Sequence, residues 1–358
     1  MIGGTTQRLV SELVTLEPLG AFALKGRVEP VAAYRVVSLD RPAGAAPTAF
    51  VGREAELWRL MAVHDAAVAP PEARLAVILG SPGLGKSRLL AEFGRRLGDR
   101  ATVVAAQCNP AGGATFAPLA EAFRELLRLD DGAGSEGTRA AVGALVPGDE
   151  SARIASGIAA LLAGTPAAPD ETFFVVRRLL ATLAGVRPVV LAVDDLQWAE
   201  PLLLDLLEHL VQWGSGVRLL VLGAGRPELR EVRSSLSAAL VADVVTLGGL
   251  DAGAATRLAA NVIGADALPA AVARRVLAAS EGNPLFVGEL VRMLVQDGAL
   301  RREGDRWTAG AQLASLEMPP TIHARNHAGA PRDGAVRRAD RAERGGQRRG
   351  GAEPAGGG

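Results

Sequence analysis

Apolar and polar positions form alternating blocks between residue 50 and about residue 250. The short apolar runs that are typical of buried strands are residues 75–79, 102–106, 189–193, 219–222 and 244–247. The stretches between them carry apolar side chains at helical spacing, as Leu89 and Phe93 do after the first run. Strands that alternate with helices pair in parallel and are covered on both faces. The pattern therefore predicts an α/β fold, with a parallel sheet and flanking helices.

Residues 1–40 follow a different pattern. A short helix is predicted at residues 6–13, and strand-like stretches follow at residues 14–16, 22–24 and 31–37. Residues 41–48, RPAGAAPT, are rich in Pro, Ala and Gly and are typical of a linker. The sheet-forming core is therefore expected to span residues 49–250.

Helical spacing continues after the core. Three helices are predicted, which start near Asp251, after Pro269 and near Asn283. They make up a small helical unit at residues 251–300. Turn residues at its end predict a hairpin over residues 298–308.

The composition changes near the end of the chain. Residues 325–358 hold eight arginines, nine glycines, one valine and no Leu, Ile, Phe or Met, so they cannot bury a core and are expected to be disordered. They are either a basic tail for RNA or acidic surfaces, or the product of a reading-frame shift. We favour the frame shift, because a GC-rich gene yields Arg, Gly and Ala out of frame.

Residues 80–87, GSPGLGKS, match the phosphate-binding pattern GxxxxGK(S/T) in full. They lie between a predicted strand and a predicted helix, an order that directs backbone N–H groups and the helix dipole at one anionic site. Lys86 is one of only two lysines among 39 Lys and Arg residues, and its compact ammonium can reach β- and γ-phosphates where a planar guanidinium cannot. The loop predicts a nucleotide site formed by Gly80, Ser81, Pro82, Gly83, Leu84, Gly85, Lys86, Ser87 and Arg88.

A second motif is the run VVLAVDD at residues 189–195. Its two carboxylates follow a buried strand, at the sheet edge where parallel α/β folds place their ligands. Magnesium beside phosphates needs hard oxygen ligands, which predicts Asp194 and the Ser87 hydroxyl as metal ligands. Asp195 is then the residue expected to orient or deprotonate the attacking water. Alone, an apolar strand that ends in Asp is weak evidence, and the argument depends on both motifs together.

Composition narrows the functional classes. The formal net charge is zero, which argues weakly against a dedicated nucleic-acid binder. The single cysteine, Cys108, has no partner, and the chain shows no signal peptide and no apolar run near 18 residues, so a reducing, cytoplasmic setting without membrane contact is expected. Cys108 is expected to be a buried small residue, and Trp198 to pack in the core. The four histidines lack metal-ligand spacing.

Several segments of the chain resemble those of a known protein family. DDLQWAE at residues 194–200 is similar to the DDLHWAD-type segment of bacterial STAND ATPases, the signal-transducing branch of the AAA-like P-loop proteins. Four further segments agree with that family: FVGREAEL at 50–57, QCNP with FAPLA at 107–120, LLVLGAGR at 219–226 and EGNPLFVGEL at 281–290. The resemblance covers roughly residues 48–323.

The resemblance implies further roles. ATP or ADP with Mg²⁺ would be the ligand, the helical unit at residues 251–300 would be a lid, and residues 301–324 would begin a winged-helix-like region. Val51, Gly52 and Arg53 would border the adenine, Pro284 would contact it, and Arg226 would sense the γ-phosphate. Arg226 could equally be a solvated arginine after a strand, and Pro284 suits the first position of a helix as well as a base contact.

Residues 1–40 resemble the last strands of class III nucleotidyl cyclase domains, which commonly precede a STAND ATPase. The segments that match are GTTQRLV at 4–10, LEPLG at 16–20, ALKG at 23–26 and EPVAAYRV at 29–36. The catalytic residues of a cyclase lie upstream of this tail, so cyclase activity is not expected.

The sequence therefore favours an ATP-binding switch of a signalling or transcription-regulating ATPase. Asp195 stands where many hydrolytic relatives have Glu, and its shorter reach to the water predicts slow hydrolysis. Protein partners or self-association through the ATPase are expected, and DNA contact only through other domains. The alternatives are a DNA-associated AAA ATPase of the origin-recognition type and a non-functional gene fragment.

Overall fold

The computed structural model describes residues 2–3, 14–22, 31–39, 49–130, 134–229, 243–304, 306–310 and 313. The expected helix at 6–13, the linker at 41–48 and the tail at 325–358 lie outside the described residues. In the part of the chain that is described, no helix combines the length and apolar character needed to span a membrane.

A five-stranded parallel sheet forms the centre of the fold. Its strands are β4 (Arg74–Leu79), β5 (Thr102–Gln107), β6 (Val189–Asp194), β7 (Leu219–Gly225) and β8 (Asp243–Thr246). They are arranged in the order β5-β6-β7-β4-β8. The predicted fold class is confirmed. β7 continues three residues beyond the apolar run because Gly223, Ala224 and Gly225 keep strand geometry and stay buried.

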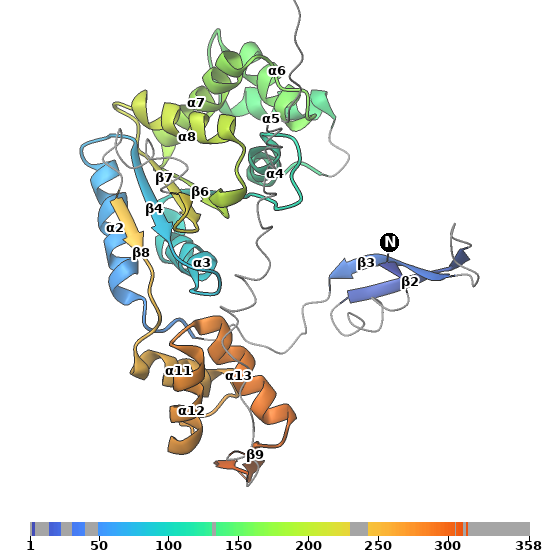
Figure 1. The fold of residues 1–358 in the computed structure, drawn as a ribbon. Helices are drawn as coiled ribbons and strands as arrows, with labels where there is room; N and C mark the ends of the chain where they lie inside the picture. Colours follow the sequence, from blue (N-terminus) through green and yellow to red (C-terminus); the bar gives the residue numbers. More distant parts are fainter. Residues whose placement is uncertain are drawn as a thin grey trace, which may run out of the picture. The chain divides into compact units, whose positions relative to one another are not determined.

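Helices cover both faces of the sheet, as Figure 1 shows. On one face, α2 (Glu54–Val68) and α3 (Lys86–Leu97) pack against the side chains of Ala76 and Ile78 of β4. The other face of the sheet, which carries Leu75 and Val77, packs against a larger group of helices. These are α4 (Ala117–Leu126), α5 (Ser135–Leu145), α6 (Ser151–Leu162), α7 (Pro169–Val186) and α8 (Pro201–Gln212). Alternate residues of each strand therefore enter two separate apolar layers.

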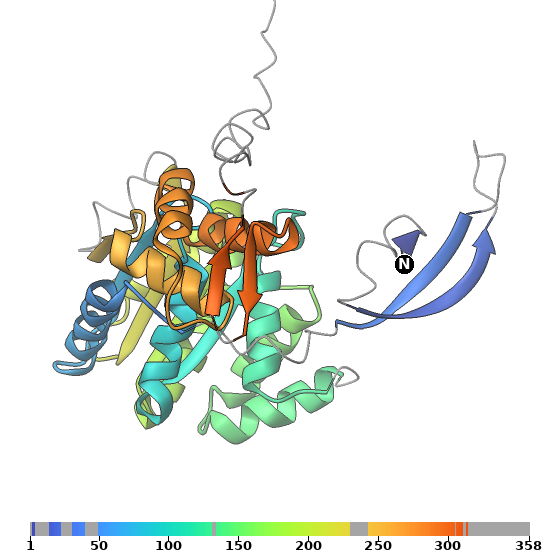
Figure 2. The ribbon, with the colours of Figure 1, turned by 90° about the horizontal axis from the view of Figure 1, so that it is seen from below.

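The chain after the sheet forms a unit that we call the lid. It comprises α11 (Ala252–Val262), α12 (Ala270–Ser280), α13 (Pro284–Gln296) and the antiparallel pair β9 (Leu300–Glu303) and β10 (Arg306–Ala309). The pair is drawn as the two red-orange arrows of Figure 2. Asp251 Oδ1 accepts from Ala254 N at 2.7 Å and Asn283 Oδ1 from Leu285 N at 3.1 Å. These two side chains cap α11 and α13, and the helices begin where capping predicted.

The N-terminal strands form a separate antiparallel sheet, in the order β1-β3-β2. They are β1 (Ile2–Gly3), β2 (Val14–Phe22) and β3 (Val31–Leu39). The prediction of separate strands at 14–16 and 22–24 is wrong, because β2 is continuous. Pro18 and Gly20 interrupt the apolar pattern, and β2 accommodates them with irregular register between Pro18 and Gly20 instead of ending.

Candidate nucleotide-binding site

The phosphate-binding loop joins the end of β4 to the start of α3. Gly83 and Gly85 have φ values of +82° and +90°, a left-handed backbone that glycine adopts without strain. Gly85 is the N-cap of α3, and the first N–H groups of a helix have no partner within it. The loop therefore directs main-chain donors and the positive end of α3 at the same point, which suits an anion.

Lys86 lies inside this loop, with only 8% of its surface exposed. Its Nζ donates to the carbonyl oxygens of Gly80 at 2.8 Å and Ser81 at 3.3 Å. Burial lowers the pKa of Lys86, and the nearby carboxylates of Asp194 and Asp195 act in the opposite direction. Neutral carbonyl oxygens thus hold the ammonium beside two carboxylates. A phosphate group can take the place of the carbonyl oxygens as the acceptor for Lys86, and the carboxylates can hold a metal ion.

Asp194 and Asp195 end β6 and differ in conformation. Asp194 Oδ1 accepts from the Asp195 N–H at 2.8 Å. Asp195 has a left-handed backbone (φ 56°, ψ 40°) and precedes the short 3-10 helix η2 (Leu196–Trp198). Its Oδ1 accepts from Gln197 Nε2 at 2.7 Å, and its Oδ2 from Gln107 Nε2 at 3.4 Å. The turn therefore separates the two carboxylates, and two amides fix the second one.

Sequence reasoning did not single out Gln107 or Gln197. Gln107 is the last residue of β5 and is in register with Asp194 of β6. Polar residues that end neighbouring parallel strands meet at one edge of the sheet, and this signal would have found Gln107. Gln197 needed knowledge of the 3-10 turn, which the sequence pattern does not provide.

A cavity of about 650 Å³ opens at this edge of the sheet. Its volume lies within the roughly 300–1,000 Å³ that is usual for small-molecule sites. It brings together phosphate-loop residues, catalytic candidates and apolar side chains: Phe50, Val51, Arg53, Pro82, Gly83, Leu84, Gly85, Lys86, Ser87, Arg88, Asp195, Gln197, Trp198, Arg226, Leu250, Leu258, Pro284 and Leu285. The predicted residues Gly52, Gly80, Ser81 and Asp194 are not among its lining residues.

Of the residues expected near an adenine, some line the cavity and one of these, Arg53, also makes structural hydrogen bonds. Val51 and Pro284 line the cavity with other apolar side chains. Pro284 is also the first residue of α13, so the two interpretations of this proline are compatible. The buried Arg53 side chain binds Leu84 O at 3.4 Å, Gly248 O and Glu56 Oε1 at 2.9 Å. Its guanidinium therefore links the segment before α2 to the phosphate loop.

The lid contacts the phosphate loop directly. Asn283, which is 4% exposed, donates from Nδ2 to Pro82 O at 3.1 Å. The Leu285 N–H approaches Gly83 O at 3.3 Å. A Cβ atom at Gly83 would lie 2.7 Å from Asn283 Oδ1 and 2.9 Å from Leu285 Cβ. The start of α13 is thus packed against the loop so closely that only glycine fits at position 83.

Arg226 follows β7 and lines the same cavity as the phosphate-loop residues. Its N–H donates to Gln197 Oε1 at 3.2 Å, and its guanidinium carbon lies 5.5 Å from the centre of the Trp198 ring. The expectation that Trp198 packs in the core is wrong, since 43% of this residue is exposed. Its ring faces a cation at the cavity wall instead, a contact that aromatic faces favour.

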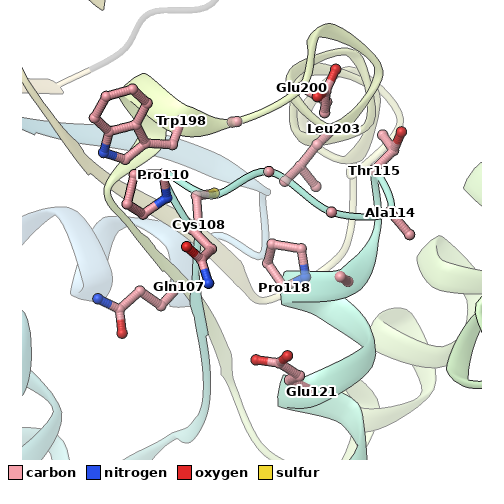
Figure 3. A pocket seen from close by; sticks show the side chains of 15 residues that line it. Gln107, Cys108, Pro110, Ala114, Thr115, Pro118, Glu121, Trp198, Glu200 and Leu203 are labelled. Atoms are coloured by element: carbon pink, nitrogen blue, oxygen red, sulfur yellow. The ribbon is translucent and has the colours of Figure 1, made fainter. Parts of the chain in front are cut away.

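A second cavity, of about 340 Å³, adjoins the first (Figure 3). Pro110 and Trp198 line both cavities. The second one is formed by the glycine-containing loop after β5 and the starts of α4 and α8, with the carboxylates of Glu121 and Glu200 in its wall. Cys108 is buried there, as expected, and burial together with Asp195 and Asp194 raises the pKa of its thiol to about 11. Cys108 is therefore a neutral packing residue.

The predicted magnesium ligands suit that ion. The described residues contain no group of three or more His, Cys, Asp and Glu side chains that could hold a metal ion by themselves. Magnesium is commonly bound by one or two carboxylates together with substrate phosphates and water. Asp194 at the end of β6 and the Ser87 hydroxyl at the start of α3 supply hard oxygen donors of that kind.

Family models match two parts of the chain. Residues 49–222 match the model described as an AAA ATPase domain, and residues 252–307 match a domain of unknown function (DUF8739). No curated protein matches the sequence. The first match runs from the segment before α2 into β7 and contains both phosphate-site motifs. This part of the chain is an AAA-type ATPase domain, a fold that implies nucleotide binding.

Solved structures resemble this chain at low sequence identity. The Orc1 protein of Aeropyrum pernix in complex with DNA matches with a TM-score of 0.45 and 17% identity, over 75% of this chain and 65% of that one. The RuvB Holliday junction branch migration motor of Thermotoga maritima matches with a TM-score of 0.40 and 15% identity, over 74% of this chain and 68% of that one. The chain thus spans just under two thirds of the Orc1 protein.

Proposed function

We propose that the AAA-type ATPase domain of this chain, with its lid, is a slow ATP-hydrolysing switch of a STAND-type signalling or transcription-regulating ATPase. The observation that carries the proposal is Lys86, buried in a glycine loop beside two carboxylates, in a cavity that the lid helps to line. The resemblance of residues 194–200 and 281–290 to that family supports the STAND assignment over a motor.

The phosphate side of the site would work through main-chain donors and one cation. The N–H groups of residues 83–87 would bind the phosphate oxygens. Lys86 Nζ would leave the carbonyl oxygens of Gly80 and Ser81 and bind the β- and γ-phosphates, because a charge-assisted bond is stronger than a bond to a neutral carbonyl. Arg226, which lines the same cavity, would contact the γ-phosphate.

Ser87 and Asp194 would hold magnesium with the nucleotide. A bound magnesium ion supplies charge neutralisation to the phosphates. Asp194 is suited to this role because its Oδ1 accepts a hydrogen bond from the main-chain N–H of Asp195 and not from a cationic side chain. Asp195 would orient the attacking water. Its side chain is one methylene shorter than Glu and is bound by two amides, which favours slow turnover.

The lid would respond to the nucleotide. Asn283 and Leu285 contact Pro82 and Gly83 of the phosphate loop, so a phosphate bound to the loop would alter the position or stability of α13. A protein partner or a second copy of the chain would recognise this change by binding to one of the two states. Residues 1–40 would be the end of a nucleotidyl cyclase domain without cyclase activity, and the protein would act in the cytoplasm.

Single-turnover hydrolysis and limited proteolysis test the proposal. With protein in excess, radiolabelled ATP should be hydrolysed slowly, and Asp195→Asn should reduce that rate by about 100-fold or more while ATP still binds. ATP with magnesium should protect the link between β8 and α11, residues 247–251 (LGGLD), from proteinase K, a protease that needs no Lys or Arg at the cleavage site. Absence of protection at saturating ATP would contradict the switch, and rapid steady-state turnover would indicate a motor.

A further inference from the structure

One amide connects the two groups that are proposed to act on the γ-phosphate. Gln197 Nε2 donates to Asp195 Oδ1 at 2.7 Å, and Gln197 Oε1 accepts from the Arg226 N–H at 3.2 Å. A carboxylate can only accept and a main-chain N–H can only donate, so the two neighbours require this orientation of the amide. Gln197 is thus bonded at the same time to the end of β6 and to the end of β7.

The 3-10 helix η2 holds Gln197 in this position. Leu196 Cδ1 fills the space beside Gly223, where a Cβ atom would lie at 2.3 Å. On the other side of Gln197, the ring of Trp198 lies 5.5 Å from the guanidinium carbon of Arg226. Three consecutive residues of η2 therefore contact β7 or the residue that follows it, and a shift of β7 would be transmitted to η2.

Gln107 makes a weaker and separate contact. It reaches the other oxygen of Asp195 at 3.4 Å from the exposed end of β5, and no hydrogen bond within the described residues joins it to Arg226. Loss of Gln107 would therefore leave the link between Asp195 and β7 in place. Gln197 is the group that joins the two ends.

We infer that Gln197 is a positioning residue that couples the Asp195 carboxylate to the γ-phosphate sensor Arg226. The inference rests on the proposed function. When Arg226 moves toward a γ-phosphate, its main chain moves Gln197, and Gln197 rotates the Asp195 carboxylate into line with the attacking water. Without Gln197, Asp195 loses its shortest bond and its orientation no longer depends on β7.

Two substitutions separate the two bonds of the amide. Gln197→Leu keeps the approximate size of the side chain and removes both bonds. Gln197→Glu keeps an acceptor for the Arg226 N–H but replaces the donor to Asp195 with a second carboxylate, which repels it. The control is Gln212→Leu, at the exposed end of α8. Thermal unfolding and equilibrium ATP binding are measured for every variant, together with single-turnover hydrolysis.

Both Gln197 variants should slow hydrolysis by about 10- to 100-fold, the size of effect expected from a misplaced catalytic group, with ATP affinity changed by less than about threefold. Gln212→Leu should hydrolyse at the wild-type rate. In the Asp195→Asn background, Gln197→Leu should slow hydrolysis by no more than about twofold further, because residues that act through one group are not additive.

Three results would overturn the inference: a wild-type rate in Gln197→Leu, additive effects in the double variant, or a loss of ATP affinity that matches the loss of rate. Failure of the proposed function gives a different result, since the wild-type protein would then not bind ATP. A wild-type protein that binds ATP but hydrolyses none would remove the role of Asp195 and with it that of Gln197. If Gln197→Leu does not fold, the Gln197→Glu variant decides.

Discussion

Replacing Lys86 by alanine is expected to abolish most ATP binding, with an affinity loss of roughly 30- to 900-fold. This range corresponds to about 2–4 kcal/mol, the value of one or two charge-assisted hydrogen bonds. The ammonium is buried and already positioned by the carbonyls of Gly80 and Ser81, so it pays little further cost of ordering when phosphate arrives. Equilibrium titration with ATP in the presence of magnesium measures the change.

The matched control for this experiment is Lys25→Ala, which removes the other lysine of the chain. It should bind ATP with wild-type affinity. Lys86→Arg should also bind weakly although it keeps the charge, because a guanidinium is too wide for the loop. Wild-type affinity in Lys86→Ala would show that the triphosphate lies elsewhere.

Alanine at position 83 is expected to separate the lid from the phosphate loop. Its Cβ would lie 2.7 Å from Asn283 Oδ1, and Asn283 is buried with its Nδ2 bonded to Pro82 O, so it has little room to move. The left-handed backbone adds about 1–2 kcal/mol of strain and the overlap about 1–3 kcal/mol. Thermal unfolding without nucleotide should therefore show a stability loss of about 2–5 kcal/mol.

Gly85→Ala provides the matched control for Gly83→Ala. Gly85 has a similar φ of +90°, but a Cβ atom there would meet nothing within 4 Å. This variant should lose only the strain of about 1–2 kcal/mol. Equal losses in the two variants would mean that the contact between lid and loop contributes nothing to stability.

The sequence predicted those features that depend on residues close together in the chain. The β4 strand, the glycine loop and α3 follow one another within residues 74–97, and the apolar run, the spacing of GxxxxGK(S/T) and the helical periodicity each identify one of them. The two carboxylates after β6 were found in the same way. Asp251 and Asn283 cap the helices that their positions predicted.

Contacts between distant residues could not be predicted in this way. Asn283 and Pro82 are 201 residues apart, and the sequence gives no reason for this pair to meet. Trp198 was assigned to the core on its apolar character, but the left-handed turn at Asp195 places it at the cavity wall beside Arg226. Similarly, β-bulge irregularities in β2 allow a strand to continue through Pro18 and Gly20, where the pattern ends.

The structure of the protein with magnesium and a non-hydrolysable ATP analogue tests the central claim most directly. We expect the β- and γ-phosphates on the N–H groups of residues 83–87, with Lys86 Nζ released from Gly80 and Ser81 and bound to phosphate oxygen. The base is expected against Val51 and Pro284. A complex in which the nucleotide lies outside this cavity, while Lys86 keeps its bonds to both carbonyls, would contradict the account.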